Sequence, residues 1–411
     1  MFGSGETKLS RPLIVMALAT TLAATGHGAA LGQDATTEES PTDPGVLAGV
    51  ELETVEVEPG VHHVLRDGVR DLDRSVEFAV FHGHMSPGDA FRINAVATRG
   101  LAANGNGVWL GGPDGVVRLG HEELVWEQEP TQNWYGSGYE VTPDDRLFRP
   151  DSGEIYNGDK WRRPVLRLKG VDAKRVRNSQ FTSDGTLWTM ASNDGQGRAR
   201  RNILVRRDDD GWRRIKYPPD PPGRKKDARP ANIGPWGVTD DGVVYVTRNG
   251  RQVQRYTDGA WETLPAPGGR IVGLHVGPEG TVWAERAETR GHTYGGGSEF
   301  VRLGEDGWTG YEVGAPRHMY PSPEAVAADG AMWVAPAGSL MSDGGCDGII
   351  RIGDTGLDRF LPGHCVYDVA PGPGGEVWLE AGTWDGNWYA PDAVGPVGVY
   401  VITPAAWTNG E

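Results

Sequence analysis

The 411-residue sequence lacks the features by which many enzyme classes are recognised. It has no H-E-x-x-H zinc motif, no phosphate-binding P-loop and no G-x-S-x-G nucleophile elbow. The signatures of zinc proteases, P-loop NTPases and α/β-hydrolases are therefore missing. Cysteine occurs only twice, and no segment beyond residue 32 has helical periodicity. An excess of 56 acidic over 40 basic residues gives a net charge of −16, which argues against nucleic acid as a general partner.

What the chain has in abundance is glycine, which recurs in a fixed context. A turn of the Asp-Gly type is followed by a short apolar strand that carries an aromatic residue, as in Asp184-Gly185-Thr186-Leu187-Trp188. The aromatic residues of the seven copies are Trp109, Phe148, Trp188, Tyr245, Trp283, Trp333 and Trp378. They lie 38 to 57 residues apart, a period that fits a four-stranded antiparallel unit.

The second half of each copy is a short strand that ends in arginine, then a polar turn and usually a tryptophan. The clearest cases run from Arg118 to Trp126, Arg206 to Trp212, Arg255 to Trp261, Arg302 to Trp308 and Arg351 to Phe360. Glycine and aspartate tolerate the positive φ that tight hairpin turns require, so each copy is interpreted as two hairpins.

These repeats predict an all-β fold, a seven-bladed β-propeller of four-stranded antiparallel blades. A single blade cannot bury both of its faces, so the bulky residues at matching positions must pack between neighbouring blades. We expect the repeat aromatics to form this interblade core. The alternative is that they are exposed platforms for a ligand.

The N-terminus has the layout of a secretory signal peptide at residues 1–32. Lys8 and Arg11 precede an apolar run at 13–24, and small residues at 30–32 offer a cleavage site. The run is short for a bilayer span, and a retained anchor is the alternative. We expect an extracytoplasmic protein, secreted or in the cell envelope, monomeric and without a membrane span once the signal is removed.

The remaining chain is interpreted as a leader and one domain. Residues 33–50 form an acidic, flexible leader, and 51–411 form a single propeller with repeats from about residue 94. The segment 51–58 resembles the outer strand of other repeats but has no blade of its own. Pairing it into the last repeat would close the ring and remove two exposed sheet edges. Residues 61–92 match no repeat.

The two cysteines, Cys346 and Cys365, flank the predicted hairpin of the sixth repeat. The turn Asp354-Thr355-Gly356 lies midway between them, so an antiparallel register puts them opposite one another, within reach of a disulfide. An exported compartment permits the bond. We therefore predict a structural disulfide, with two buried free thiols as the alternative.

Long insertions gather at one end of the predicted propeller. They occupy 191–202, 286–298, 335–347 and 381–396 inside blades, and 217–233 and 314–323 between blades. Insertions confined to one face build a binding surface on a repeat scaffold, and aromatic residues beside Asn and Asp suit sugars, peptides or planar ligands. The candidate ligand-binding residues there are Trp384, Asn387, Trp388, Tyr389, His292, Tyr294, His318 and Tyr320. The alternative is that they only pack the loops down.

One stretch has the opposite charge to the rest. Residues 198–229 hold twelve Lys and Arg against five acidic residues, and they include Arg200 and Arg201. Such a basic patch on an acidic protein can dock an anionic partner. The alternative is a solvated, charged loop.

The one candidate constellation for chemistry joins carboxylates and histidines. Glu285 and Glu380 each lie two residues beyond a repeat aromatic, and His275 and His364 lie on or near the inner strands. Carboxylates there can hold Mg²⁺ or Ca²⁺, with one histidine as a general base. An ordinary polar mouth of the channel is the alternative.

The repeat, Asp-Gly-x-x-Trp followed by Val/Ile-x-Arg and Asp-Gly-x-Trp, resembles the propeller repeats in sensor regions of two-component regulators. It is also similar to the blades of virginiamycin B lyase, which opens a cyclic depsipeptide by metal-assisted elimination. For the Trp-Phe-x-Glu element of the lyases the chain keeps Trp283-Ala284-Glu285 and Trp378-Leu379-Glu380, in which the glutamate is one residue nearer the tryptophan. It has no Glu-x-His-Gly sequence, the second element of that family. The resemblance implies the fold more strongly than an activity.

Three functional hypotheses follow from the sequence, the last of which is a purely structural role in the cell envelope. The first is an exported propeller that binds a small molecule, glycan, peptide or envelope protein through its long loops, as a sensor or recognition module without catalysis. The second is a metal-dependent lyase or hydrolase that uses Glu285, Glu380 and one of His275 or His364.

Overall fold

The structure is a computed structural model. The residues that it describes are 46–47, 50–52, 54–64, 77–78, 93–94, 101–104, 107–112, 115–119, 124–127, 140–150, 152–164, 168, 171–193, 202–216, 233–287, 298–313, 319–338, 347–354, 356–384 and 394–408. Among them no helix is long and apolar enough to cross a membrane. The predicted signal peptide lies outside these ranges, as does nearly all of the acidic leader.

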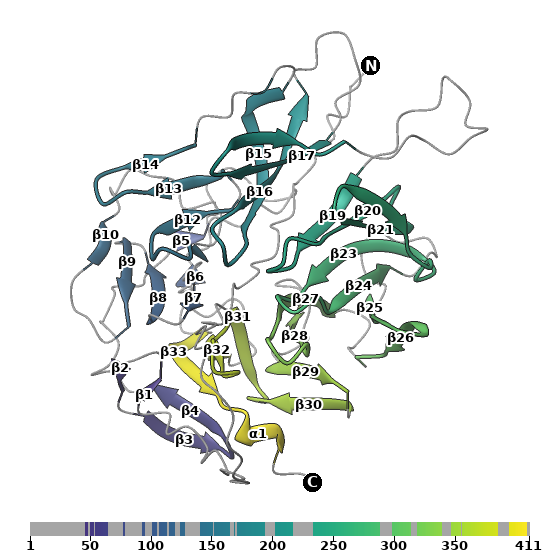
Figure 1. Cartoon of the computed structure of the whole chain (residues 1–411). Coiled ribbons are helices and arrows are strands. Elements are labelled where there is room, and N and C mark those ends of the chain that lie inside the picture. Colours follow the sequence, from purple (N-terminus) through teal and green to yellow (C-terminus); the bar gives the residue numbers. More distant parts are fainter. Residues whose placement is uncertain are drawn as a thin grey trace, which may run out of the picture.

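Six four-stranded antiparallel sheets follow one another along the chain, and Figure 1 shows them arranged around a common centre. In each sheet the strands pair in chain order. Blade 1 is β7 (Leu101–Asn104), β8 (Gly107–Gly112), β9 (Gly115–Arg118) and β10 (Leu124–Glu127). Blade 2 is β11 (Glu140–Val141), β12 (Leu147–Arg149), β13 (Glu154–Tyr156) and β14 (Trp161–Arg162). Blade 3 is β15 (Val171–Phe181), β16 (Leu187–Asn193), β17 (Asn202–Asp208) and β18 (Gly211–Arg214).

The second half of the chain repeats the pattern. Blade 4 is β19 (Ile233–Val238), β20 (Val244–Arg248), β21 (Gln252–Thr257) and β22 (Ala260–Thr263). Blade 5 is β23 (Arg270–Val276), β24 (Val282–Ala287), β25 (Ser298–Gly304) and β26 (Gly307–Tyr311). Blade 6 is β27 (Met319–Val326), β28 (Met332–Gly338), β29 (Ile349–Gly353) and β30 (Gly356–Phe360). The prediction of an all-β propeller with four-stranded antiparallel blades is confirmed.

The seventh repeat forms a five-stranded sheet instead of a seventh four-stranded blade. It consists of β31 (His364–Pro371), β32 (Val377–Trp384) and β33 (Val394–Ile402), with β4 (Val61–Val64) and β3 (Thr54–Glu58) from the N-terminal part of the chain. Figure 1 shows the purple β3 and β4 close to the yellow C-terminal strands. Strand β33 pairs with β4 and not with β3.

The prediction that the segment 51–58 pairs directly with the last repeat is therefore wrong, because β4 is the partner of β33. Val61 and Val64 of β4 are buried, whereas Val55 and Val57 of β3 are each 48% exposed. Burial of the two β4 valines places β4 next to β33, and β3 becomes the outermost strand of the sheet. Residues 61–64, which match no repeat, thus supply the strand that joins the two parts of the chain.

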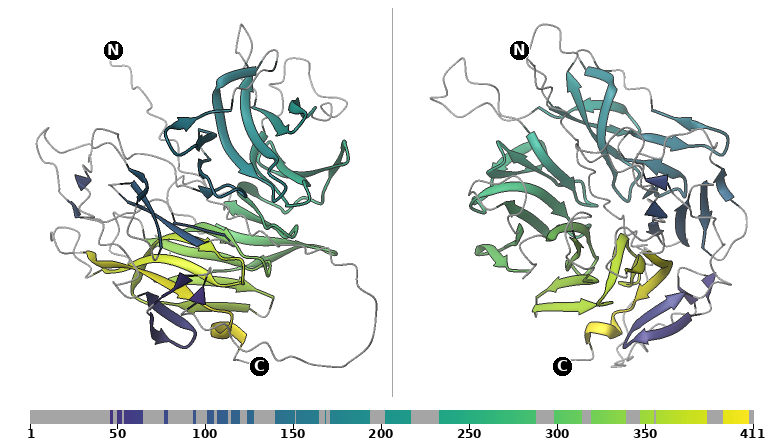
Figure 2. Two further views of the ribbon diagram at one scale, coloured as in Figure 1. Left: turned by 60° about the vertical axis from the view of Figure 1, so that its left-hand side comes forward. Right: turned by 180° about the vertical axis from the view of Figure 1, so that it is seen from behind.

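The other elements are small. The pairs β1 (Val46–Leu47) with β2 (Val50–Glu51) and β5 (Glu77–Phe78) with β6 (Ile93–Asn94) are separate two-stranded sheets. The one helix in the described ranges is α1 (Ala405–Thr408), which directly follows β33. Both views of Figure 2 show it at the outer side of the C-terminal strands.

Apolar side chains fill the space between each pair of consecutive sheets. Trp283 of blade 5, for example, packs in one cluster with Met332 of blade 6. Trp378 of the five-stranded sheet packs in another with Leu110 of blade 1. Equivalent clusters join the remaining neighbours. All seven repeat aromatics are at most 6% exposed, so the prediction that they form interblade core is confirmed.

The key residues of the two halves of the repeat lie opposite one another on adjacent strands. The aromatic residue of the second strand is in register with the arginine of the third in five blades, namely Trp109 with Arg118, Trp188 with Arg206, Tyr245 with Arg255, Trp283 with Arg302 and Trp333 with Arg351. In blades 1, 3 and 5 the guanidinium lies 5.5 to 5.8 Å from the centre of the indole ring, a favourable cation–π geometry.

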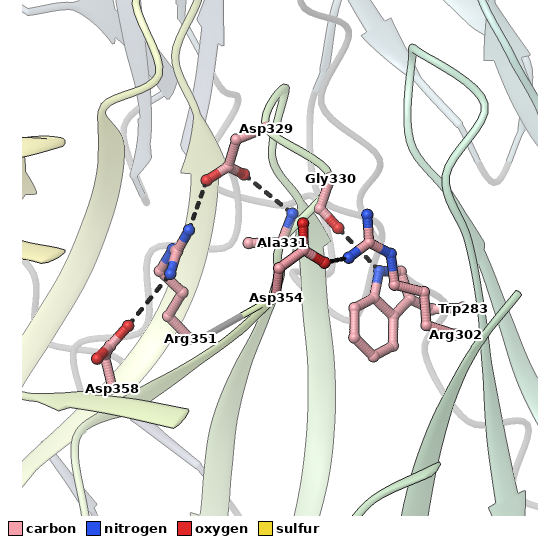
Figure 3. A network of polar contacts seen from close by, with 8 residues as sticks. All are labelled: Trp283, Arg302, Asp329, Gly330, Ala331, Arg351, Asp354 and Asp358. Carbon is pink, nitrogen blue, oxygen red and sulfur yellow. Dashed lines mark hydrogen bonds and ion pairs between the residues drawn. The ribbon is translucent and has the colours of Figure 1, made fainter. Parts of the chain in front are cut away.

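Polar contacts at the end that carries the short turns join one blade to the next (Figure 3). The Trp283 indole N–H of blade 5 donates to the Gly330 carbonyl in the β27–β28 turn, at 2.9 Å. Arg302 of blade 5 also pairs with Asp354 in the β29–β30 turn. We call this end of the molecule the short-turn end. Gly330 has φ +80, the left-handed conformation that such turns require.

The predicted disulfide stays a prediction, because Cys346 lies outside the described residues. Cys365 lies beyond the β29–β30 hairpin, although the Gly348 N–H still donates to the His364 carbonyl at 2.9 Å. Cys365 belongs to β31 of the next sheet, where it is in register with Gly382. The chain turns between Leu361 and Gly363, where both residues have positive φ, and starts a new sheet.

The turn between β3 and β4 is tightly fitted to the C-terminus. Gly60 has φ +70, and a Cβ added there would lie 2.5 Å from the Ala406 backbone nitrogen. The Thr403 N–H donates to the Gly60 carbonyl at 2.9 Å. The turn is thus held against the start of α1.

Gly60→Ala should lower the free energy of unfolding by about 2 kcal/mol, from backbone strain plus the contact with Ala406. Gly259→Ala is the matched control, because Gly259 has φ +83 but nothing within 4 Å of the added Cβ. Urea unfolding of both variants measures the difference. Equal losses would show that the fit of the N-terminal hairpin against α1 does not stabilise the fold.

Candidate functional site

A cavity of about 750 Å³ opens at the short-turn end, between blades 4 and 5. Its walls come from the β19–β20 and β23–β24 turns and from one face of β20, β21 and β22. Ala328, in the β27–β28 turn of blade 6, completes the lining. The volume lies within the usual range for small-ligand sites.

One wall is a row of side chains across blade 4. Tyr245, Arg255 and Glu262 are in register on β20, β21 and β22, and register partners in a sheet share one face. The Arg255 guanidinium pairs with the Glu262 carboxylate at 2.6 Å. Trp261 also borders the cavity, but its ring lies on the other face of β22, where the indole N–H donates to the Lys216 carbonyl of blade 3 at 2.8 Å.

The opposite part of the lining is acidic. Asp240 and Asp241 come from the β19–β20 turn and Glu279 from the β23–β24 turn. The Asp240 backbone N–H donates to the Pro278 carbonyl at 3.1 Å, which holds the two turns together. Among the ion pairs between described residues, none includes Asp240, Asp241 or Glu279.

Burial raises the pKa of Asp240 to about 6, and repulsion from Asp241, Asp184 and Glu279 adds to the rise, while a hydrogen bond from the Ser183 backbone opposes it. Asp184 in the equivalent turn of blade 3 behaves differently. Burial acts against its ionisation, but hydrogen bonds from Thr182 and Thr186 and the charge of Arg206 outweigh this and lower its pKa. Negative charge is therefore costly at the cavity and compensated in blade 3.

The cavity thus combines three carboxylates that have no ion-pair partner among the described residues with the pair of Arg255 and Glu262. Such a lining binds ligands by charge. The lining contains no cysteine, serine or histidine, and so it has no side-chain nucleophile of these three types.

The predicted chemistry residues lie elsewhere, in two sheets that are separated by blade 6. His275 is on the innermost strand of blade 5, and Glu285 is on the next strand. His275 Nε2 and Glu285 Oε2 both lie 2.8 Å from the point that a Cβ on Gly273 would occupy. The absence of a side chain on Gly273 brings the imidazole and the carboxylate together, as the sequence prediction required for this pair.

His275 is 1% exposed, and neither ring nitrogen has a hydrogen-bond partner within the described part of the chain. Burial lowers its pKa to about 3. The imidazole is therefore neutral at physiological pH, and a base with so low a pKa is far from the value near the working pH that general-base catalysis favours.

Glu380 and His364 belong to the five-stranded sheet. Glu380 on β32 is 1% exposed and in register with Asp368, whose carboxylate accepts the Leu101 N–H of blade 1 at 2.8 Å. His364 meets the edge of the Tyr400 ring, with ring centres 5.5 Å apart. On the other side His63 of β4 stacks on Tyr400 at 4.8 Å, and burial together with the nearby His364 lowers the pKa of His63.

Among the described residues, the structure does not bring together enough side chains to form the predicted metal site. Within the described ranges no group of three or more His, Cys, Asp and Glu side chains could hold a metal ion. Ca²⁺ and Mg²⁺ take six or more ligands, chiefly oxygen, and His275 with Glu285 supplies one nitrogen and one carboxylate. The Mg²⁺ or Ca²⁺ ion and the roles of Glu285, Glu380, His275 and His364 stay predictions.

Most of the predicted loop residues cannot be placed. Asn387, Trp388, Tyr389, His292, Tyr294, His318, Arg200 and Arg201 lie outside the described residues. Trp384 and Tyr320 belong to β32 and β27, but their side chains are outside the description. The basic stretch is described only at 202–216, where Arg206 and Arg213 both pair with Asp208. Binding through the long loops stays a prediction.

The residues of the cavity were missed by the sequence analysis. One signal was present, because Asp240 and Asp241 put two acids before Gly242 where the neighbouring repeat, at Asp184-Gly185, has one. A second was Glu262, directly after the repeat Trp261. The long insertions predicted a binding surface at the opposite end of the propeller.

No protein-family model and no curated protein sequence matches this chain. Solved structures of similar fold include virginiamycin B lyase from Staphylococcus aureus with quinupristin, 18% identical with a TM-score of 0.40 over 60% of this chain and 79% of that one. The extracellular domain of a putative one-component system from B. thetaiotaomicron is 15% identical, TM-score 0.43, over 74% of this chain and 38% of that one. The Cps50 (Swd1) β-propeller domain of Myceliophteria thermophila is 13% identical, TM-score 0.44, over 70% and 94%.

These neighbours include both kinds of protein that the repeats resemble, a virginiamycin B lyase and an extracellular domain of a signalling system. At these identities the likeness concerns the fold alone. Ligand and activity have to be argued from the residues of this chain.

Asp240→Asn should stabilise the protein at neutral pH. Because the folded state raises the pKa of Asp240 to about 6, the stability that this group contributes is present below pH 4 and lost as the pH rises through 6. We expect the variant to gain about 1 kcal/mol in free energy of unfolding at pH 7.5, a value reduced for partial exposure, and nothing at pH 4.

Asp306→Asn is the matched control, since Asp306 is an exposed acid at the β25–β26 turn of blade 5, outside the cavity lining. It should change the free energy of unfolding by less than about 0.5 kcal/mol at either pH. Urea unfolding at the two pH values measures both variants. A loss of stability in Asp240→Asn at pH 7.5 would contradict the electrostatic description of the cavity.

Proposed function

We propose that this chain is an exported binding propeller, a sensor or recognition module that holds a ligand or partner without catalysis. The ring is closed by the five-stranded sheet as its seventh member. The cavity between blades 4 and 5 is a binding surface of this module. One observation supports the proposal most: an open cavity of about 750 Å³ is lined by carboxylates whose charge no cation in the described part of the chain balances.

Proteins as a rule remove such unbalanced charge, because it opposes folding. Its retention next to an open cavity of ligand size favours binding over a structural role. The ligand belongs to the classes expected from the sequence, a small molecule, glycan, peptide or envelope protein. The long loops at the other end are proposed as a second surface, and export rests on the signal peptide at residues 1–32.

A substitution that fills the cavity tests this function without knowledge of the ligand. Thr257 lines the cavity and is exposed at the end of β21, so Thr257→Trp should occupy the space and leave the core intact. In a ligand-observed NMR screen of neutral, anionic and cationic compounds, we expect hits on the wild-type protein that are lost in this variant.

Thr309→Trp is the control, because Thr309 is an exposed threonine of β26 outside the cavity lining. It should retain the hits. If every hit binds Thr257→Trp as well as the wild-type protein, the cavity is not a binding surface.

A metal-dependent lyase or hydrolase is the second proposal. It is favoured by one observation, the buried His275 beside Glu285 above the Gly273 backbone. This proposal predicts a saturable stabilisation by Mg²⁺ or Ca²⁺, roughly 2 to 3 kcal/mol at a hundredfold excess over Kd. The gain should disappear in Glu285→Gln and persist in the control Glu305→Gln, an exposed glutamate of the β25–β26 turn. No gain with either ion on the wild-type protein would remove it.

A further inference from the structure

The arginine of the repeat neutralises an acidic turn in some blades and not in others. In blade 6, Arg351 pairs with Asp329 of the β27–β28 turn at 2.8 Å and with Asp358 at 3.1 Å (Figure 3). In blade 3, Arg206 pairs with Asp208 at 3.2 Å, and its charge is the last of the contributions that lower the pKa of Asp184 in the β15–β16 turn. Blade 6 therefore shows that the repeat can place a guanidinium beside the carboxylate that precedes the turn glycine.

In the two blades that border the cavity, the arginine at this repeat position pairs with a carboxylate outside the turn of its own blade. Arg255 of blade 4 pairs with Glu262 of β22. Arg302 of blade 5 pairs with Asp354 of blade 6, as Figure 3 shows. Among the ion pairs between described residues, the turn acids of these blades, Asp241 and Glu279, lack the arginine partner that Asp329 has in blade 6.

The position left open by these arginines faces the cavity. Asp241 and Glu279 line it together with Asp240, and the acids come from two turns that a backbone hydrogen bond joins. The Trp261 ring lies on the other face of β22, where it packs against Tyr256 and blade 3, so the carboxylates are the feature of this lining that selects a ligand. A ligand with a positive charge would meet this feature.

We infer that the cavity between blades 4 and 5 binds an organic cation of the guanidinium or alkylammonium class, whose charge takes the place beside Asp240, Asp241 and Glu279 that an arginine of the chain fills in blade 6. This inference rests on the proposed function and names the ligand class of its cavity. Carboxylates bind guanidinium through short, charge-assisted hydrogen bonds, so the repeat itself shows which chemistry the turn accepts.

The cation has two conceivable sources, a free amine and a basic side chain on a peptide. Agmatine serves as the probe for the first source. The capped tripeptide Ala-Arg-Ala serves for the second, and Ala-citrulline-Ala is its neutral match. Isothermal titration calorimetry at pH 7.5 and low salt measures the affinities of all three for the full chain.

We expect agmatine, the arginine peptide or both to bind, and the citrulline peptide to bind about tenfold more weakly or not at all. Asp240→Asn with Glu279→Gln should weaken the cation by at least about tenfold. The control Asp306→Asn should change its affinity less than about twofold. Binding should also weaken below about pH 6, because Asp240, which faces Asp184, Asp241 and Glu279, then takes up a proton.

The outcomes separate this inference from the proposed function. Hits that Thr257→Trp abolishes but that are neutral or anionic would overturn the cation class and leave the binding function standing. Equal affinity for the arginine and citrulline peptides, or full affinity in the double variant, would also overturn it. So would saturable Ca²⁺ binding lost in the double variant with no agmatine binding. If no compound of any charge depends on the cavity, both proposals fail.

Discussion

The burial of one aromatic side chain per repeat against the next sheet is the constraint on which the rest of the structure depends. A four-stranded antiparallel sheet has two faces, and each becomes part of a core only when a neighbouring sheet covers it. Because the aromatic residue of the second strand, such as Trp283 or Trp333, is fully buried between sheets, its strand position is fixed. The register then fixes the arginine opposite it on the third strand, at the level of the short turns.

The candidate site is a consequence of that fixed register. In blades 3 to 6 the arginine accompanies a turn with an acidic residue, and the carboxylate that the guanidinium contacts decides whether the charge of that turn is balanced. Arg351 pairs both with the turn acid Asp329 and with Asp358 on the neighbouring strand, whereas Arg255 pairs with Glu262 on the neighbouring strand. In blades 4 and 5 the arginine pairs away from the turn of its own blade, so the acidic residues of the β19–β20 and β23–β24 turns line the cavity without it. A functional difference can thus arise in a repeat protein from a side-chain pairing alone, with no change in the backbone plan.

The structural features that can be predicted from this sequence are those that are local and that recur in each repeat. The Asp-Gly turns and the buried aromatics were found because each recurs with its neighbours in a constant order. The place of β4 was not predicted, since Val61-His62-His63-Val64 is short and resembles no other repeat, and only burial of its valines selects it over β3 as the partner of β33. Cys365 was placed at the hairpin of the sixth repeat, although Pro362-Gly363 is a turn dipeptide and precedes the start of a new sheet. The cavity depends on which of two nearby acids an arginine contacts, and composition cannot show this.

The most direct test of this description is the pKa of Asp240, measured by a ¹³C carboxyl titration of the protein and of Glu262→Gln. The unbalanced cavity predicts a pKa of about 6 in the wild-type protein. In Glu262→Gln, Arg255 loses its partner and is free to turn to Asp241, as Arg351 does to Asp329, so the pKa of Asp240 should fall. A wild-type pKa near the ordinary value of about 4, unchanged in the variant, would contradict the claim that diverted arginines leave the cavity negatively charged.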